Sequence, residues 1–427
     1  MIFDPLKLAL LVAFFSAVVF VSQRLFSGAE RTAVLLMQLG FLLYSGLAAA
    51  TEGVPDFLIV SCCLFSAAFL FSYVVGRLMF GRLRISEEGY WDAGLQEVEA
   101  RGLWKIFILF YFILLTLKLT YPEFKLSRIF SPPPPDIKAW FLGRFEGDVN
   151  PFTKAIDYFL IVLTPFFYLG IYSLRRRLSL ILLLFFLSLY LTYVNDGYIG
   201  RGRVFFALVV FLVFVWSLRP SLRPVLVSGA ALLAPFLAVA FQYYGAARLG
   251  LDVNVVSFFS AFEYIYRSEF SFLAETGVPL IESGAHVDLV KYFAWLITLP
   301  VPGFLKGGLD VALVNYEISE IVLNRDVGGA GFYVVLAGLL AEAYYIYGQN
   351  FYWLHALMLG FIFAIYSSVL AGSKHLLGVY AYVFVVFFYS LNRGGVASAL
   401  PLVVNGFVVF AIFMVFLAVR QSKQSRL

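Results

Sequence analysis

The chain has 427 residues, of which 62% are hydrophobic and only 13% are charged. Because a soluble domain carries roughly 25% charged residues, this composition excludes an ordinary soluble enzyme and indicates an integral membrane protein. The formal net charge of +5 then fits cytoplasmic loops and anionic headgroups, and it does not indicate nucleic acid binding. The apolar runs are continuous and do not alternate with polar positions, so we expect membrane-spanning helices and not a closed β-barrel.

Apolar runs close to the roughly 20-residue length of a membrane span recur along the chain. They cover residues 6–21, 32–50, 57–80, 104–121, 156–174, 178–194, 204–218, 224–242, 351–371, 375–391 and 396–419. The first run lacks a small-residue cleavage pattern, so we interpret it as a retained helix and not as a signal peptide. The sequence therefore predicts an all-α polytopic membrane protein with about 11–12 transmembrane helices.

The distribution of lysine and arginine predicts the orientation of these helices. Basic residues collect at alternate ends of the runs and mark the cytoplasmic side. The opposite, outer side then holds residues 122–152, residues 195–203 and the long charged stretch 241–349. A crossing by residues 331–347 would place the basic tail outside, so we expect an interfacial or partly re-entrant helix there.

These assignments divide the chain into three parts. The first, residues 1–242, is an N-terminal bundle of about eight helices. The second, residues 243–350, is an outer, periplasmic loop region with short interfacial helices, for which residues 257–276 and 289–299 show helical patterns. The third, residues 351–427, contains the C-terminal transmembrane helices.

Two glycine-rich turns on the predicted outer face carry arginine. They are NDGYIGRGR at 195–203, with Arg201 and Arg203, and NRGG at 392–395, with Arg393. Arginine presents a planar, permanently charged fork that suits phosphate oxygens, so two such turns could bind one diphosphate. The alternative is that these arginines only extend to the headgroup region.

Three further cations of the long outer stretch are candidate phosphate ligands. Arg267 follows Glu263 by four residues, so a structural ion pair on a helix is at least as good an interpretation as ligand binding. Arg248 has no such partner in the sequence, and Lys306 lies in the proline-rich turn PVPGFLKGG.

Glu342, in AEAYYIYG, is the candidate general base, since a carboxylate among tyrosines beside a membrane tends to hold its proton more tightly. An interfacial glutamate paired with an arginine is the alternative. The sequence predicts no cofactor and no metal, because the three histidines are scattered and no phosphate-binding loop or dinucleotide fingerprint occurs. Cys62 and Cys63 are adjacent in an apolar helix, where we expect no disulfide.

Five motifs, taken together in this order, resemble the Wzy-type O-antigen polymerases, or oligosaccharide repeat unit polymerases. They are GRGRVFFAL at 200–208, YRSEFSFLAE at 266–275, LPVPGFLKGG at 299–308, AEAYYIYG at 341–348 and LNRGGVASAL at 391–400. The chain departs from the pattern at Ala341, where the resemblance leads us to expect glycine, at Asn392, and in the arginine-poor turn around Lys306. The N-terminal half resembles the family only in hydropathy.

The resemblance implies a glycosyltransferase of the inner membrane that works on the periplasmic or extracellular face without a nucleotide. It would polymerise oligosaccharide units carried on undecaprenyl diphosphate, with a chain-length regulator as a possible protein partner. Arg201, Arg203, Arg393 and Arg267 would then face the leaving diphosphate, and Glu342 would take the proton of the acceptor hydroxyl. The alternatives are a transporter or flippase for a lipid-linked or anionic solute, and an O-antigen ligase.

Overall fold

The structure, a computed structural model, describes most of the N-terminal third and most of the predicted outer region. The described ranges are 3–26, 28–80, 101–120, 129–132, 177–196, 219–249, 258–299, 313–327, 332–371 and 386–401, together with single residues between them. Within these ranges the regular structure is helical, apart from one isolated bridge between Phe3 and Thr51. The predicted all-α class is therefore confirmed for the described residues.

Three described helices are long and apolar enough to cross a membrane. They are Pro5–Leu25, Phe57–Phe80 and the segment Arg223–Ala240. The protein is thus a membrane protein with at least these candidate spans, whereas the total of 11–12 spans and the sidedness stay predictions. The helix Phe57–Phe80 has the same bounds as the predicted run, because a bilayer-length apolar stretch bounded by charge specifies both its ends.

Chain contacts divide the protein into two compact units. The first comprises Met1–Glu87, Phe262–Ser373 and Val386–Val404, and the second Glu88–Ala261, Lys374–Val385 and Asn405–Leu427. The described helices of the second unit are α6 (Arg101–Thr120), α9 (Leu178–Asp196) and α11 (Arg223–Leu249). Helix α12 (Phe258–Ile265) lies at the junction in sequence.

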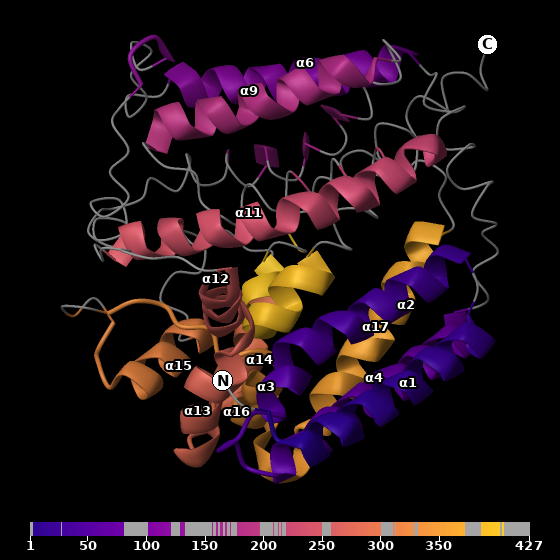
Figure 1. Ribbon diagram of the computed structural model, residues 1–427, viewed down its shortest axis with the longest axis vertical. Helices are drawn as coiled ribbons and strands as arrows, with labels where there is room; N and C mark the ends of the chain where they lie inside the picture. The colour runs from indigo at the N-terminus through magenta and orange to yellow at the C-terminus, as the bar shows by residue number, and fades with distance from the viewer. Residues whose placement is uncertain are drawn as a thin grey trace. The chain divides into compact units, whose positions relative to one another are not determined.

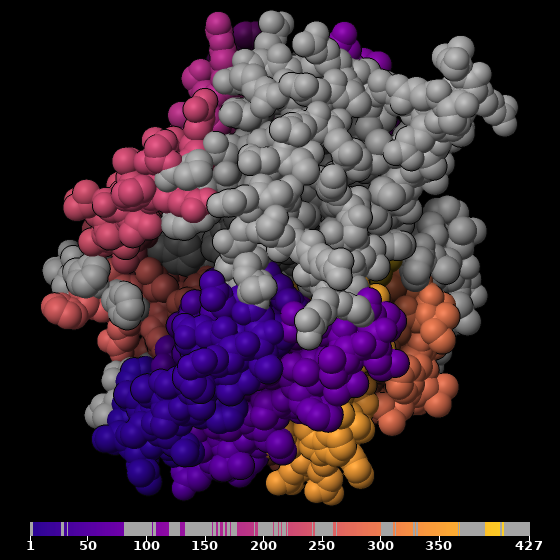
Figure 2. Space-filling model, turned by 90° about the vertical axis from the view of Figure 1, so that its right-hand side faces the viewer, coloured from indigo at the N-terminus to yellow at the C-terminus, as the bar shows by residue number. Residues whose placement is uncertain are grey.

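The N-terminal part of the first unit supplies α1 (Pro5–Leu25), α2 (Gly28–Phe41), η1 (Leu42–Gly46), α3 (Leu47–Ala49) and α4 (Phe57–Phe80). The start of α1 is tied to the turn before α4. Asp4 caps the helix, and the Lys7 ammonium bonds to the Asp56 carboxylate at 2.8 Å and the Val54 carbonyl at 2.6 Å. In Figure 2 the N-terminal residues, indigo to purple, form a continuous surface on one face.

Helix α17 (Trp353–Ala371) runs alongside α4, as Figure 1 shows. A side chain at Gly360 would overlap Ser72 and the Phe69 carbonyl, and one at Gly76 would lie 2.7 Å from the Ala364 side chain. Small residues let membrane helices approach to backbone contact, which explains why α4 and α17 pack so closely.

The later part of the first unit is built from short helices. They are η4 (Tyr266–Phe270), η5 (Leu273–Gly277), α13 (Val278–Glu282), α14 (Leu289–Thr298), α15 (Val314–Leu323), α16 (Leu339–Phe351) and η7 (Val386–Leu391). Residue 257 lies outside the described residues, and residues 258–276 are helical except for Ser271, so the predicted helical pattern is confirmed there, with two π-helical segments that the periodicity did not indicate. Helix α14 confirms the predicted short helix at 289–299.

The predicted helix at 331–347 is wrong at its start. Residues 332–338 form no regular secondary structure, and α16 begins only at Leu339. The cause is tertiary: the Ser319 hydroxyl accepts the Val335 amide at 2.9 Å, and the Thr276 hydroxyl donates to the Leu336 carbonyl at 2.5 Å. Gly338, at φ +83°, then turns the chain into the helix.

Candidate functional site

Segments that lie far apart in the sequence meet in the first unit. Segment η4 supplies Glu269, which lies 3.1 Å from the guanidinium of Arg393. Arg393 belongs to NRGG, which the sequence predicts to be a turn between two helices. In the structure residues 392–401 are helical, and Gly395, at φ +74°, interrupts the helix; the Arg393 turn below means residues 392–395 at this interruption. Helix α16 supplies Glu342, which bonds to the backbone directly after the same turn. Three of the motifs singled out in the sequence therefore form one arrangement around residues 392–397.

Arg393 is the cation at the centre of this arrangement. Its Nη1 donates to the Tyr389 hydroxyl at 2.7 Å, and its Nη2 faces Glu269. The guanidinium lies 5.1 Å from the centre of the Phe272 ring and 5.3 Å from that of Tyr389. Cation–π contacts of this kind hold a guanidinium in place while leaving donors free, and the Arg393 side chain remains 21% exposed.

Further donor capacity remains on the same side chain. The Arg393 Nε atom is buried and has no hydrogen-bond partner among the described residues. Since a guanidinium carries five N–H donors, the contacts to Tyr389 and Glu269 leave further N–H groups on Nη1 and Nη2, whereas the buried Nε is not accessible to an incoming anion. Tyr44 of η1 also belongs to this region, because its ring lies 4.8 Å from that of Phe270, next to Glu269.

Glu342 lies in the first turn of α16 and is only 2% exposed. Its carboxylate accepts the backbone amides of Val396 and Ala397, the latter at 2.8 Å. Gly395 precedes them at φ +74°, and a side chain there would come within 2.5 Å of the Glu342 carboxyl carbon. Glu342 thus holds the turn that presents Arg393, and glycine at 395 is required for the carboxylate to fit.

Two buried side chains beside Glu342 were not singled out from the sequence. His355 of α17 is fully buried, with its Nε2 atom 3.7 Å from a Glu342 oxygen. Tyr292 of α14 is also fully buried; burial raises the pKa of its phenol, and the Glu342 charge adds to the rise. The available signal for His355 was a polar residue within an apolar run, which often marks a functional position.

The other predicted site residues do not belong to this arrangement among the described residues. Arg267 pairs with Glu263 at 2.9 Å, and both side chains are exposed, so the predicted helical ion pair is confirmed. Arg201, Arg203 and Lys306 lie outside the described residues. Arg248 belongs to α11, and its side chain also lies outside them.

Within the described ranges, no group of three or more histidine, cysteine or acidic side chains could hold a metal ion. Cys62 and Cys63 are free thiols, as their adjacency on a helix predicted.

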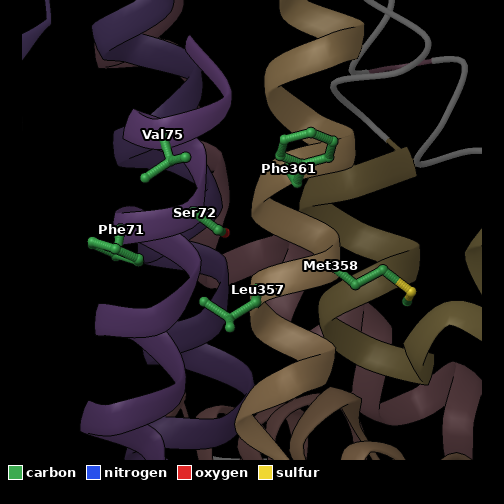
Figure 3. A pocket seen from close by; sticks show the side chains of 6 residues that line it. All are labelled: Phe71, Ser72, Val75, Leu357, Met358 and Phe361. Carbon is green, nitrogen blue, oxygen red and sulfur yellow. The ribbon is translucent and has the colours of Figure 1, made fainter. Parts of the chain in front are cut away.

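A hollow of about 400 Å³ lies between α4 and α17 and is lined by Phe71, Ser72, Val75, Leu357, Met358 and Phe361 (Figure 3). The Ser72 hydroxyl donates to the Phe69 carbonyl of its own helix at 3.1 Å. Because the lining holds no titratable group, this hollow is not a candidate for the chemistry.

Comparison of the chain with protein-family models, with curated proteins and with solved structures finds no match. The functional interpretation therefore rests on the residues and their geometry.

Proposed function

We propose that the protein is a membrane glycosyltransferase that polymerises oligosaccharide units carried on undecaprenyl diphosphate, at the outer face of the inner membrane. The observation that carries the proposal is the partly exposed Arg393, held between Glu269 and two aromatic rings on a turn that Glu342 fixes. A rigid cation with unused donors suits a leaving group that gains negative charge.

In the proposed reaction the acceptor hydroxyl of one unit attacks the anomeric carbon of the sugar on the lipid diphosphate. A new glycosidic bond forms, the bond from carbon to the diphosphate oxygen breaks, and the hydroxyl proton passes to a base. Arg393 would stabilise the departing diphosphate, with exposed Arg267 on the neighbouring η4 segment as a second cation. The sugar–diphosphate bond supplies the energy, so no nucleotide is required.

We assign Glu269 and Glu342 mainly to positioning. Glu269 orients the guanidinium of Arg393 across 3.1 Å. Glu342 is only 2% exposed, and each of its carboxylate oxygens accepts an amide, so an acceptor hydroxyl does not reach it in this conformation. A role as general base therefore needs a conformational change, and we propose instead that Glu342 sets the position of the Arg393 turn.

The test is polymerisation by purified protein given undecaprenyl-diphosphate-linked oligosaccharide without nucleotide sugar or metal, with products separated as a ladder. Arg393→Lys keeps the charge that pairs with Glu269 but lacks the planar guanidinium. The variant should therefore fold but no longer produce the ladder of polymers. Arg267→Lys is the matched control, because an exposed cation bound as a point charge should tolerate the exchange. A full ladder from Arg393→Lys in folded protein would remove Arg393 from the site.

Glu342→Gln separates the two roles of that residue. Glutamine keeps one acceptor oxygen for the amides but cannot take up a proton. A base role predicts loss of the ladder with little loss of thermal stability, whereas a positioning role predicts that both decline together. Offering a different lipid as the acceptor in place of a second repeat unit tests the ligase alternative in the same assay.

A transporter or flippase is the second candidate, and one observation favours it. Glu30 of α2 is buried and lies 2.9 Å from Arg77 of α4, with the Tyr73 hydroxyl donating to it at 3.0 Å. Ionisable residues buried in membrane helices often serve a solute pathway. Movement of the lipid-linked unit across liposomes without any ladder, and its loss in Arg77→Gln, would support this function instead.

A further inference from the structure

Helix α14 has a buried aromatic side and an exposed apolar side. Its inner side carries Tyr292 and Trp295, which are buried and stacked with ring centres 5.8 Å apart. Its outer side carries Val290, Phe293 and Ile297, spaced three and four residues apart and exposed, with Val290 at 78% and Ile297 at 76%. The outer side is therefore an apolar stripe without a covering element among the described residues.

The length of α14 excludes a membrane crossing. The helix has 10 residues, from Leu289 to Thr298, and so spans about 15 Å, half of the hydrocarbon thickness. Asp288 caps its start by accepting the Val290 amide at 2.8 Å. A short capped helix with one apolar side has the form of helices that lie in the plane of the membrane interface.

Contacts within the first unit place α14 at the depth of a membrane surface. The Tyr344 hydroxyl of α16 bonds to Ser61 at 2.7 Å, and Ser61 lies only about 6 Å along α4 from its first residue, Phe57. Helix α16 is therefore level with one end of a candidate span. The chain just before α14 is bound to α16, because the Val287 amide donates to the Tyr345 carbonyl at 3.0 Å.

The inner side of α14 also reaches the candidate site. Tyr292 is close enough to Glu342 for the carboxylate charge to influence its phenol, and Glu342 holds the turn of Arg393. The same helix thus lies near Glu342 with its buried side and presents apolar side chains at the depth of the membrane surface with the other.

We propose that the outer side of α14, formed by Val290, Phe293 and Ile297, inserts into the boundary between headgroups and acyl chains of the bilayer. Burying this stripe in lipid is favourable, whereas exposing it to water would leave an aggregation-prone apolar patch next to the site. Insertion would fix the depth of Glu342 and the Arg393 turn relative to the lipid surface. The proposal requires only that the protein is a membrane protein. It does not depend on the proposed glycosyltransferase activity.

The test uses the full-length protein in phospholipid nanodiscs, one copy per disc, with a nitroxide on a single introduced cysteine. The background carries Cys62→Ala and Cys63→Ala, which removes both native thiols. Labels at Val290→Cys and Ile297→Cys are compared with a matched exposed valine, Val327→Cys, which is 49% exposed in the loop after α15. Collision rates with oxygen, which concentrates in lipid, and with a water-soluble nickel chelate are measured.

Insertion predicts an oxygen-to-nickel ratio several-fold higher at positions 290 and 297 than at 327. Equal ratios at the three positions would show that the stripe faces water and would overturn the proposal. Shielding of positions 290 and 297 from both reagents, together with spin–spin broadening in discs that hold two copies, would assign the stripe to a second copy of the chain and would overturn it as well. None of these outcomes depends on enzymatic activity.

Discussion

Substitution of Gly395 by alanine should destabilise the protein strongly, for two separable reasons. The first is conformational, because Gly395 has φ +74°, a left-handed conformation that costs an L-residue roughly 1–2 kcal/mol. The second is steric, because the added carbon would lie 2.5 Å from the Glu342 carboxyl carbon and would overlap the carboxylate oxygens. The carboxylate must then give up at least one amide bond, and a charged hydrogen bond contributes about 1.5–3 kcal/mol.

The two contributions together predict that Gly395→Ala lowers the free energy of unfolding by about 2.5–5 kcal/mol. Gly53→Ala provides the matched control, since Gly53 has φ +82° but nothing within 4 Å of an added carbon. Gly53→Ala should lower the free energy of unfolding only by the conformational contribution, about 1–2 kcal/mol. The measurement is unfolding in mild detergent by denaturant, followed by tyrosine and tryptophan fluorescence, with the apparent melting temperature as a second readout.

Equal destabilisation by Gly395→Ala and Gly53→Ala would show that overlap with the Glu342 carboxylate adds nothing to the cost at position 395. A double-mutant cycle sharpens the result. In a Glu342→Ala background the overlapping atoms are absent, so Gly395→Ala should add only its conformational cost, and the two changes should be clearly non-additive. Additive losses would show that Gly395 and Glu342 act separately, and the turn of Arg393 would then need another anchor.

Three further predictions concern the contacts around the site. Glu269→Gln should lower stability by about 1.5–3 kcal/mol, because it replaces the charged partner of Arg393 by a neutral one, and the same unfolding assay measures the loss. Arg267→Ala should change stability by less than about 1 kcal/mol, since its ion pair is exposed to water. Ser61→Ala leaves the buried Tyr344 hydroxyl without its partner and should cost about 1–3 kcal/mol, whereas the double change Ser61→Ala with Tyr344→Phe should recover much of that loss.

The sequence predicted the helices well where the bilayer specifies them. The predicted run 57–80 coincides with α4, and the run 351–371 differs from α17 by two residues at its start. Residues 332–338 are equally apolar but not helical, because hydroxyl groups of Ser319 and Thr276 bind their backbone. Hydropathy contains no information about such side-chain partners, so the start of α16 could not be found from it.

Two residues of the arrangement around 392–397 were singled out from the sequence, but the arrangement itself was not. Arg393 and Glu342 were both singled out, each from its local motif, and Arg267 was correctly paired with Glu263. The pairing of Arg393 with Glu269 was not foreseen, because local periodicity relates residues three or four apart and these two belong to different segments. His355 and Tyr292 were missed for the same reason, since their positions beside Glu342 depend on how α14, α16 and α17 pack.

The joint placement of these residues changes what the motif around Glu342 means. Read locally, AEAYYIYG suggested a base, because a carboxylate stood among tyrosines beside a membrane. In the fold, that carboxylate binds the amides of Val396 and Ala397, and the glycine before them is the residue that makes room for it. Glu342 and Gly395 therefore form one contact, which fixes the position of Arg393, the cation that we propose meets the diphosphate.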